Sequence, residues 1–176
     1  VIAVSDIHVD YIGPLLGDHG LALGWLGIPF TIVAVIGLIN AFNMLDGIDG
    51  LAAATAMISI VAMLAFGDFT GASLGTLMLV QILFASLIPY VCVNLGWPDG
   101  RKIFMGDAGS TLLGFVLAWS LVYLSHGNVA RLDAVDVLWC VAFPIIDTVA
   151  VMYRRVRLGR SPFKPDRQHF HYLLLD

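Results

Sequence analysis

Charged side chains are scarce in this sequence of 176 residues: they make up 12% of it, whereas soluble domains carry about a quarter. Hydrophobic residues reach 59%, and the mean hydropathy is +0.90. This balance excludes an ordinary water-soluble domain and is typical of a membrane protein. The net charge of −4 is small, and we predict no nucleic-acid partner.

Cysteine is also rare. The two residues, Cys92 and Cys140, both fall inside apolar segments, so neither a disulfide framework nor a zinc site is indicated. The sequence has no repeat of fixed period and no low-complexity stretch. No basic region followed by an apolar stretch and a cleavage site opens the chain. We interpret the opening VIAV as the last turn of another spanning helix, and the chain as an N-terminally truncated fragment.

Long apolar runs are what the sequence has instead. Segments of about 17 to 25 apolar residues can cross a bilayer as helices. Such segments are found at 28–46, 51–67, 73–96, 109–125 and 135–153, and a tail follows at 154–176. We therefore predict an all-α, polytopic membrane protein with five full transmembrane helices and the end of a sixth, forming a fragment of a larger helical bundle.

The basic residues are distributed unevenly between the two sides of this predicted bundle. If the five segments alternate, Arg131 lies on one side and the other basic residues lie opposite it: Arg101, Lys102, Arg154, Arg155, Arg157, Arg160, Lys164 and Arg167. The positive-inside rule makes the richer side cytoplasmic. The segments NMLDGIDG, GWPDGRKIFMGDAGST and the tail then share the cytoplasmic face, and residues 11–27 form an external loop.

Polar residues recur at every third position near the cytoplasmic end of the first full span. On a helix this spacing sets Asn40, Asn43 and Asp46 on adjacent turns, as a polar strip that Gly47 ends. A carboxylate in the last turn faces the negative end of the helix dipole, so we expect a cation near Asp46. Simple solvation of Asp46 at the membrane surface is the alternative. Asp49 precedes the next helix, where capping alone would explain it.

A second cluster reads FMGDAGST, at 104–111. Gly106 and Gly109 allow tight turns, and a helix that begins near Ser110 would point its free N–H groups at the loop, which suits a phosphate. Asp107 lies at the mouth of that site. Its alternative role is a helix cap.

The tail SPFKPDRQHFHYLLLD carries cationic and hydrogen-bonding groups that suit phosphate, namely Lys164, Arg167, His169 and His171. A His-x-His pair in an extended segment sets both rings on one side. Anchoring to lipid headgroups has no need of histidine, although it is the simpler interpretation of the arginines at 154–160.

Asp147 lies about two turns inside the last predicted span, where an unpaired carboxylate is costly. We expect it to face the bundle interior or a watery cleft, with Pro144 kinking the helix nearby. Whether Asp147 pairs with another helix or reaches the cytoplasmic cluster is left open.

Together these motifs resemble those of the polyprenyl-phosphate N-acetylhexosamine-1-phosphate transferases, the membrane enzymes of glycosyltransferase family 4 that begin lipid-linked glycan assembly. The matching stretches are NAFNMLDGIDGLA (40–52), PYVCVNLG (89–96), KIFMGDAGST (102–111) and SPFKPDRQHFHYLL (161–174). They occur in the family's order, over nearly the whole chain. Within the family, the stretches MYRRVRLGRSPFKPDRQHFH and NAFNMLDGIDGL are most similar to the bacterial undecaprenyl-phosphate N-acetylglucosamine-1-phosphate transferases.

The resemblance implies transfer of N-acetylglucosamine 1-phosphate from UDP-GlcNAc to undecaprenyl phosphate, with release of UMP and with Mg²⁺ or Mn²⁺ as cofactor. It makes 1–176 a single transmembrane catalytic domain of the bacterial inner membrane, with its active site on the cytoplasmic face. The product would start a lipid-linked cell-envelope glycan such as lipopolysaccharide. The resemblance leaves open whether the protein forms a homodimer.

The family's site residues can be carried over by position. Asp46 and Asp107 resemble the catalytic carboxylates that hold the metal and the diphosphate, with support from Asn40 and Asn43. The residues that match those holding the uracil ring are Asp49, Asn94 and Phe104. The residues that match a loop gripping phosphate are Arg167, His169 and His171, and both histidines are candidate catalytic residues.

Two features depart from the family pattern. The family has an upstream pair of adjacent aspartates for the lipid phosphate, and nothing in VIAVSDIHVDYIG matches it, so we expect that motif before Val1. The family's His-x-His-His reads His169-Phe-His171-Tyr172 here, so a phenol replaces one imidazole.

Other interpretations of the same residues stay open. The donor in the same chemistry is alternatively another UDP-N-acetylhexosamine or the phospho-N-acetylmuramoyl-pentapeptide nucleotide. A membrane transporter fragment is an alternative of another class, although transporter sites usually lie near the bilayer midplane. CDP-alcohol phosphotransferases need a GxxxDxxxD array that the sequence lacks. In a non-catalytic membrane scaffold, Asp107 and His169 would be replaceable without loss of function.

Overall fold

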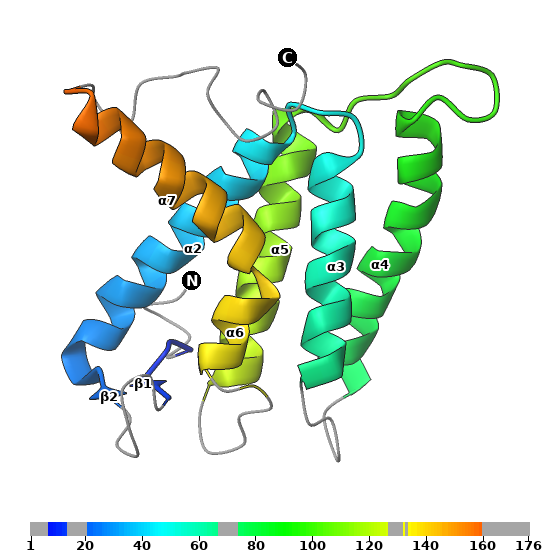
Figure 1. Cartoon of the computed structure of the whole chain (residues 1–176). Coiled ribbons are helices and arrows are strands. Elements are labelled where there is room, and N and C mark those ends of the chain that lie inside the picture. Colours follow the sequence, from blue (N-terminus) through cyan, green and yellow to red (C-terminus); the bar gives the residue numbers. More distant parts are fainter. Residues whose placement is uncertain (1–6, 14–20, 67–73, 127–131, 133, 160–176) are drawn as a thin grey trace.

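The computed structural model describes residues 7–13, 21–66, 74–126, 132 and 134–159, and these form a bundle of helices (Figure 1). The helical elements are η1 (Gly24–Leu26), α2 (Gly27–Leu45), α3 (Leu51–Phe66), α4 (Leu74–Asn94), α5 (Gly106–Ser125), α6 (Ala134–Cys140) and α7 (Ala142–Arg157). One antiparallel pair of two-residue strands, β1 (Tyr11–Ile12) and β2 (Leu21–Ala22), lies in the region expected as a loop. The prediction of an all-α protein is confirmed.

Each of the first four predicted spans coincides with one long helix, whereas the fifth does not. The segment 135–153 is divided into α6 and α7 at Val141, whose φ of −123° and ψ of 24° leave the helical region. Pro144 explains the break, because it has no N–H to donate to the carbonyl of Cys140 and its ring crowds that carbonyl. The kink expected near Pro144 is a full break of the helix. The prediction of one continuous helix over 135–153 is therefore wrong, and the segment forms two helices, α6 and α7.

Two of these helices are long and apolar enough to cross a membrane, namely Gly24–Leu45, which includes η1, and Gly106–Ser125. The apolar helices Leu51–Phe66 and Met78–Asn94 are shorter. Large apolar side chains point outward along these helices, including Val33, Ile58, Ile82 and Leu112, which are all more than 60% exposed. Such an outer surface suits contact with lipid tails better than contact with water.

The interior contains small polar residues as well as apolar ones. Thr31, Ser59, Ser110 and Ser120 are at most 1% exposed. Small hydroxyl-bearing residues let helices approach closely, and they are enriched between helices in membranes. Asp147 in α7 is also buried, at 8% exposure, as expected of a carboxylate inside the last segment.

The helices α2 and α5 pack closely against each other, because α5 presents a glycine to α2. A Cβ atom at Gly114 would lie 2.9 Å from the Cα atom of Ile39 and 3.3 Å from the carbonyl oxygen of Leu38. Phe42 and Leu117 fill the adjoining core and are fully buried. The backbones of α2 and α5 therefore meet with no side chain between them at Gly114.

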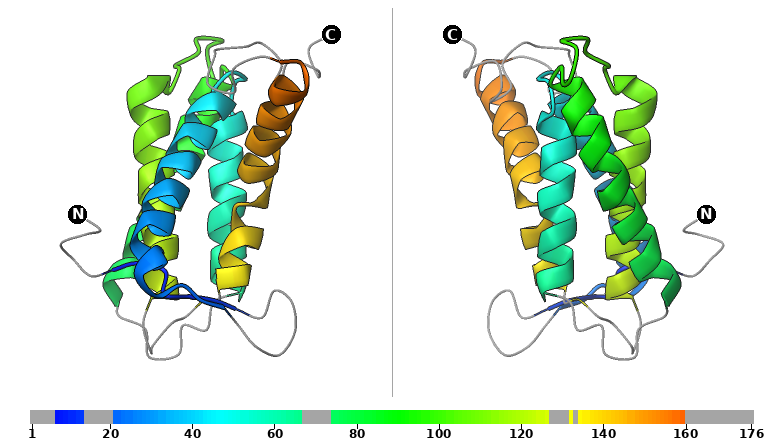
Figure 2. Two further views of the ribbon diagram at one scale, coloured as in Figure 1. Left: turned by 90° about the vertical axis from the view of Figure 1, so that its left-hand side faces the viewer. Right: turned by 90° about the vertical axis from the view of Figure 1, so that its right-hand side faces the viewer.

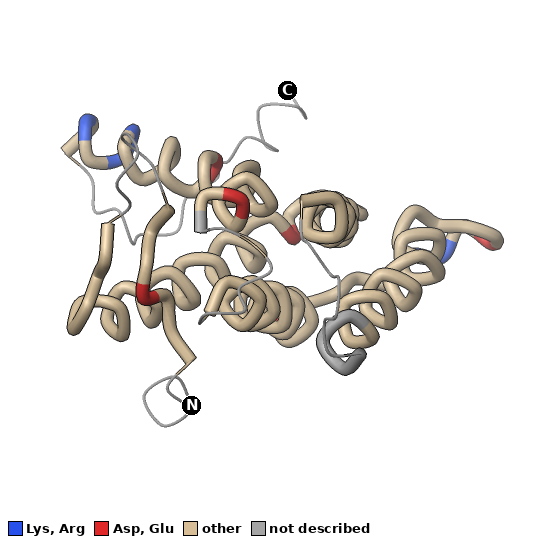
Figure 3. Tube along the Cα trace, turned by 90° about the horizontal axis from the view of Figure 1, so that it is seen from below, with Lys and Arg blue, Asp and Glu red and all other residues tan. Residues whose placement is uncertain are grey.

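The loops with concentrated polar residues share one end of the bundle. Both side views in Figure 2 show the turn after α2 and the loop before α5 at one end, with the β1–β2 pair at the other. Figure 3 shows that the Lys and Arg residues of the described chain lie only in the loop before α5 and near the end of α7. Within the described residues, the positive charges and the aspartate-rich loops therefore occupy the same side, as the sequence predicted.

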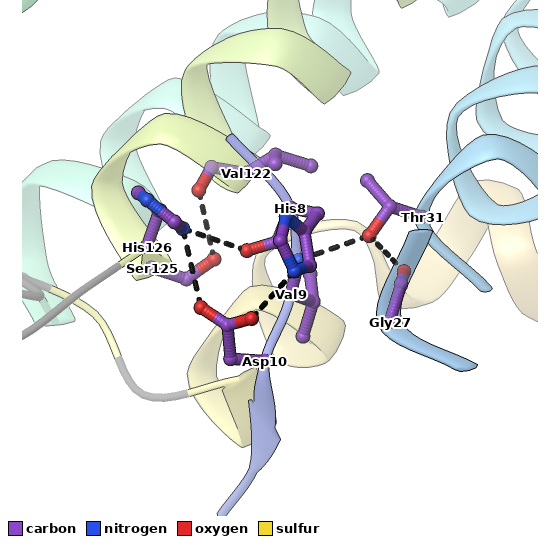
Figure 4. A network of polar contacts seen from close by, with 8 residues as sticks. All are labelled: His8, Val9, Asp10, Gly27, Thr31, Val122, Ser125 and His126. Atoms are coloured by element: carbon purple, nitrogen blue, oxygen red, sulfur yellow. Dashed lines mark hydrogen bonds and ion pairs between the residues drawn. The ribbon is translucent and has the colours of Figure 1, made fainter. Parts of the chain in front are cut away.

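A polar network closes the opposite end (Figure 4). The N–H of Val9 donates to Thr31 Oγ1 at 2.9 Å, and the Thr31 hydroxyl donates to the carbonyl of Gly27 at 2.7 Å. His126 Nδ1 donates to the carbonyl of His8 at 2.8 Å, and His8 Nε2 lies 2.6 Å from Asp10 Oδ1. The network joins the segment before β1 to both α2 and α5.

Replacing Gly114 by alanine should destabilise the protein, whereas the same change at Gly37 should not. The new methyl group at Gly114 would meet the α2 backbone, and overpacking costs about 1–3 kcal/mol. Gly37 has open space around it, so alanine there should gain helix propensity, by about 0.5–1 kcal/mol. Thermal unfolding in detergent measures both variants. Equal midpoints for the two would contradict the close α2–α5 contact.

Candidate active site

Two loops meet at the end of the bundle that holds the aspartates. One joins α2 to α3 through residues 46–50, and the other joins α4 to α5 through residues 95–105. Lys102 of the second loop reaches Asp49 of the first, with its Nζ atom 2.5 Å from Oδ2. Residues separated by more than fifty positions in the sequence therefore form one site.

Asn43 connects the last turn of α2 to the first turn of α5. Its Nδ2 atom donates to Asp107 Oδ1 at 3.3 Å and to Ser110 Oγ at 2.9 Å. Ser110 is fully buried, and its hydroxyl also lies 3.1 Å from the carbonyl oxygen of Gly106. The amide thus orients the Asp107 carboxylate, and the buried hydroxyl fixes the amide in turn.

Asp46 is the C-terminal capping residue of α2 and lies close to Asp107. Burial raises the pKa of the Asp46 carboxyl, and the negative charge of Asp107 raises it further, while a hydrogen bond from the Gly106 N–H opposes the shift. Two carboxylates that disfavour each other's charge are an arrangement that a cation would stabilise.

Asp107 is not the cap of α5. The helix begins at Gly106, four residues before the expected start, so Asp107 belongs to the first turn, and the capping residue Met105 makes no side-chain cap hydrogen bond. Gly106 has a φ of +68°, which a residue with a side chain rarely adopts. The carboxylate of Asp107 is exposed, close to the positive end of the helix dipole.

The residues expected to hold the base lie beside Asp49. Asn94 ends α4 and is 2% exposed, and its Nδ2 atom donates to the carbonyl of Ile103 at 2.8 Å. Phe104 follows Ile103 and is 72% exposed. The exposed aromatic ring of Phe104 offers a surface for stacking a planar group.

Asn40 is placed differently from the other polar residues of α2. It is exposed, and its Nδ2 atom donates to the carbonyl of Ile36 in its own helix at 2.8 Å. The structure therefore brings Asn43, Asp46 and Asp107 together, pairs Asp49 with Lys102 and turns the Asn40 amide back on α2. Arg167, His169 and His171 lie outside the described residues.

Sequence reasoning missed two residues of the site. Ser110 was read only as the start of a helix, although its place in GDAGST predicts that it shares a helix face with Gly106 and lies near Asp107. Lys102 was read only as a topology signal, and no local pattern indicates its partner, which is 53 positions away. The contact of Ser110 with Asn43 depends on the packing of α5 against α2, and the contact of Lys102 with Asp49 depends on the meeting of two loops.

The donor set fits a hard divalent cation. The carboxylates of Asp46 and Asp107, together with the amide oxygen of Asn43, are oxygen ligands, and Mg²⁺ is commonly bound by one or two carboxylates plus substrate phosphates. Within the described part of the chain, no group of three or more His, Cys, Asp or Glu residues could hold a metal by itself.

Asp46→Asn should raise the thermal unfolding midpoint of the metal-free protein at neutral pH. Because the pKa of Asp46 is higher in the folded state than in a free side chain, its ionised form opposes folding, and the neutral amide removes that cost. Mg²⁺ should stabilise the unmodified protein and leave the variant almost unchanged, since ligand binding to the folded state raises its stability. A lower midpoint for the variant without metal would contradict the electrostatic reading.

Comparisons with known proteins identify the family of this chain. The glycosyl transferase family 4 profile matches residues 1–125. Similar proteins occur in Haemophilus influenzae (43% identical, 99% of this chain, 50% of the relative), Pasteurella multocida (44%, 99% and 49%) and Salmonella typhi (42%, 99% and 48%). Each is named undecaprenyl-phosphate alpha-N-acetylglucosaminyl 1-phosphate transferase. The chain spans about half the length of these curated relatives. With its sequence motifs, its helical bundle and this match, the chain belongs to glycosyl transferase family 4.

Proposed function

We propose that the full-length protein transfers N-acetylglucosamine 1-phosphate from UDP-GlcNAc to undecaprenyl phosphate, giving undecaprenyl-diphosphate-GlcNAc and UMP. The names of the relatives contain the acceptor, undecaprenyl phosphate, and the transferred group, N-acetylglucosaminyl 1-phosphate, and the family resemblance of the motifs supports UDP as the carrier of that group. The observation that carries the proposal is the meeting of Asp46, Asn43 and Asp107 at the ends of two apolar helices. A transfer between a membrane lipid and a soluble nucleotide sugar needs its reactive groups at such a position.

In this reaction an oxygen of the lipid phosphate attacks the phosphorus that carries the sugar. The bond from that phosphorus to the bridging oxygen breaks, and UMP leaves with the electron pair. Several negative charges converge in the transition state, so catalysis depends on positioning and on positive potential more than on a strong base. The N-terminus of α5 supplies such a potential beside Asp107.

Asp46 and Asp107, with Asn43 in support, would hold Mg²⁺ or Mn²⁺, which supplies charge neutralisation on the diphosphate when bound. Asn43 keeps Asp107 in place through its bond to the buried Ser110 hydroxyl. The charge of Asp107 disfavours the ionised form of Asp46 in the metal-free site, and a bound cation would offset this repulsion.

Asp49, Asn94 and Phe104 would hold the uracil ring. The exposed Phe104 ring is suited to stacking, and Asp49 to accepting an N–H of the base. Arg167, His169 and His171, which belong to the tail, would grip phosphate in this scheme.

The proposal extends to the position of the protein in the cell. The aspartate-bearing end of the bundle would face the cytoplasm of a bacterium, with the chain crossing the inner membrane five times. The outward apolar side chains support this orientation, as do the described Lys and Arg residues, which lie in the loop before α5 and near the end of α7, both at the aspartate-bearing end in Figure 1. UDP-GlcNAc would enter from the cytosol, and undecaprenyl phosphate from the bilayer.

Asp107→Asn should lower UMP release on the order of 100-fold or more, because it removes a charge from the reacting centre. The assay uses the full-length protein in detergent with UDP-GlcNAc, undecaprenyl phosphate and Mg²⁺. Asp99→Asn is the matched control, since Asp99 is exposed in the loop that precedes α5 and accepts from the Arg101 N–H at 3.2 Å. The control should keep the parent rate within about twofold. A folded parent that releases no UMP from any UDP-N-acetylhexosamine would overturn the proposed function.

A further inference from the structure

The ion pair between Lys102 and Asp49 is the link between the two loops of the site. The Nζ–Oδ2 distance is 2.5 Å, and the side chains are 47% and 27% exposed. Lys102 lies in the loop before α5, and Asp49 in the turn before α3. An ion pair at this exposure contributes little to the stability of the fold, so we look for its role in the orientation of Asp49.

Asn94 lies directly between the backbones on either side of this pair. Its Nδ2 atom bonds the carbonyl of Ile103, the neighbour of Lys102. Its buried Oδ1 atom would lie 3.8 Å from a Cβ atom at Gly50, the neighbour of Asp49. Oδ1 has no hydrogen-bond partner within the part of the chain that the structure describes. The ion pair and Asn94 thus form one unit that joins both loops.

The neighbouring cation shows that position, and not charge alone, distinguishes Lys102. Arg101 is 89% exposed, and its Nε atom lies 3.8 Å from Asp99 Oδ2 in the same loop. That contact ties the loop only to itself. Lys102 instead reaches across to the carboxylate that would receive the base.

We propose that Lys102 is a positioning residue for the nucleotide: it holds Asp49 in the orientation that accepts an imide N–H of uracil. This inference rests on the proposed function, and it adds a residue to which no role in the reaction has been assigned. With Oδ2 bound by the ammonium group, the carboxylate is held in one orientation, and its oxygens act as hydrogen-bond acceptors. Uracil presents an N–H at its N3 position, whereas cytosine presents an acceptor there. The pair therefore favours uridine over cytidine nucleotides.

The test compares Lys102→Met, Lys102→Arg and Arg101→Met in the full-length protein. Calorimetry measures the affinity for UMP and for CMP, and the steady-state assay gives kcat and KM for UDP-GlcNAc. Lys102→Met should weaken UMP binding and raise KM about tenfold with kcat nearly unchanged, as expected for loss of uniform binding. Its preference for UMP over CMP should narrow. Lys102→Arg should recover most of the affinity, and Arg101→Met should match the parent.

Thermal unfolding of the same variants separates positioning from folding. Lys102→Met should unfold within a few degrees of the parent, because the pair contributes little to stability.

Unchanged UMP affinity and an unchanged preference for UMP over CMP in Lys102→Met would overturn the inference while leaving the proposed function intact. So would a loss of affinity that arginine does not restore. Conversely, UMP binding that depends on Lys102 in a protein that transfers no sugar phosphate would support the nucleotide site and overturn the transferase. A folded parent that binds neither UMP nor UDP-GlcNAc would overturn both.

Discussion

The close contact between α2 and α5 is the constraint on which the rest of the site depends. Gly114 lets the two backbones meet, and this sets the last turn of α2 beside the first turn of α5. Asn43 can then reach both Asp107 and Ser110 from the neighbouring helix. A wider separation would break the amide bridge and move Asp46 away from Asp107, so a packing contact about two turns away governs the chemistry.

The carboxylates of Asp46 and Asp107 repel each other at the end of an otherwise apolar bundle. Burial and the charge of Asp107 both disfavour the ionised form of Asp46. Natural proteins keep such costs where function needs them, and a cation with a diphosphate would remove this one. The carboxylate of Asp49 differs from that of Asp46, because the ammonium group of Lys102 lies beside it. One aspartate-rich stretch, NMLDGIDG, therefore supplies two carboxylates with opposite electrostatic circumstances.

The outer surface of the bundle differs in polarity from its two ends. Apolar side chains cover the outside of the helices, and small hydroxyl-bearing residues fill contacts within. At the end away from the aspartates, the contacts of His8, Val9 and His126 fasten the N-terminal segment to α2 and α5 (Figure 4). The polar loops and this network thus lie at the two ends, and the apolar outer surface of the helices between them is suited to a bilayer.

The sequence by itself determined the helices, the side on which the polar loops gather and the residue types of the site, because apolar length, charge bias and motif spacing are local properties. Pro144 also signalled the α6–α7 break, although not its extent. Tertiary structure alone decided which polar residues meet. The spacing of three sets Asn40, Asn43 and Asp46 on adjacent turns, but it does not show that the Asn43 amide bonds across to α5 while the Asn40 amide bonds back to its own helix. The rotation of α2 is fixed by its contact with Gly114, and the pairing of Lys102 with Asp49 by the meeting of two loops, and neither is encoded in any local pattern.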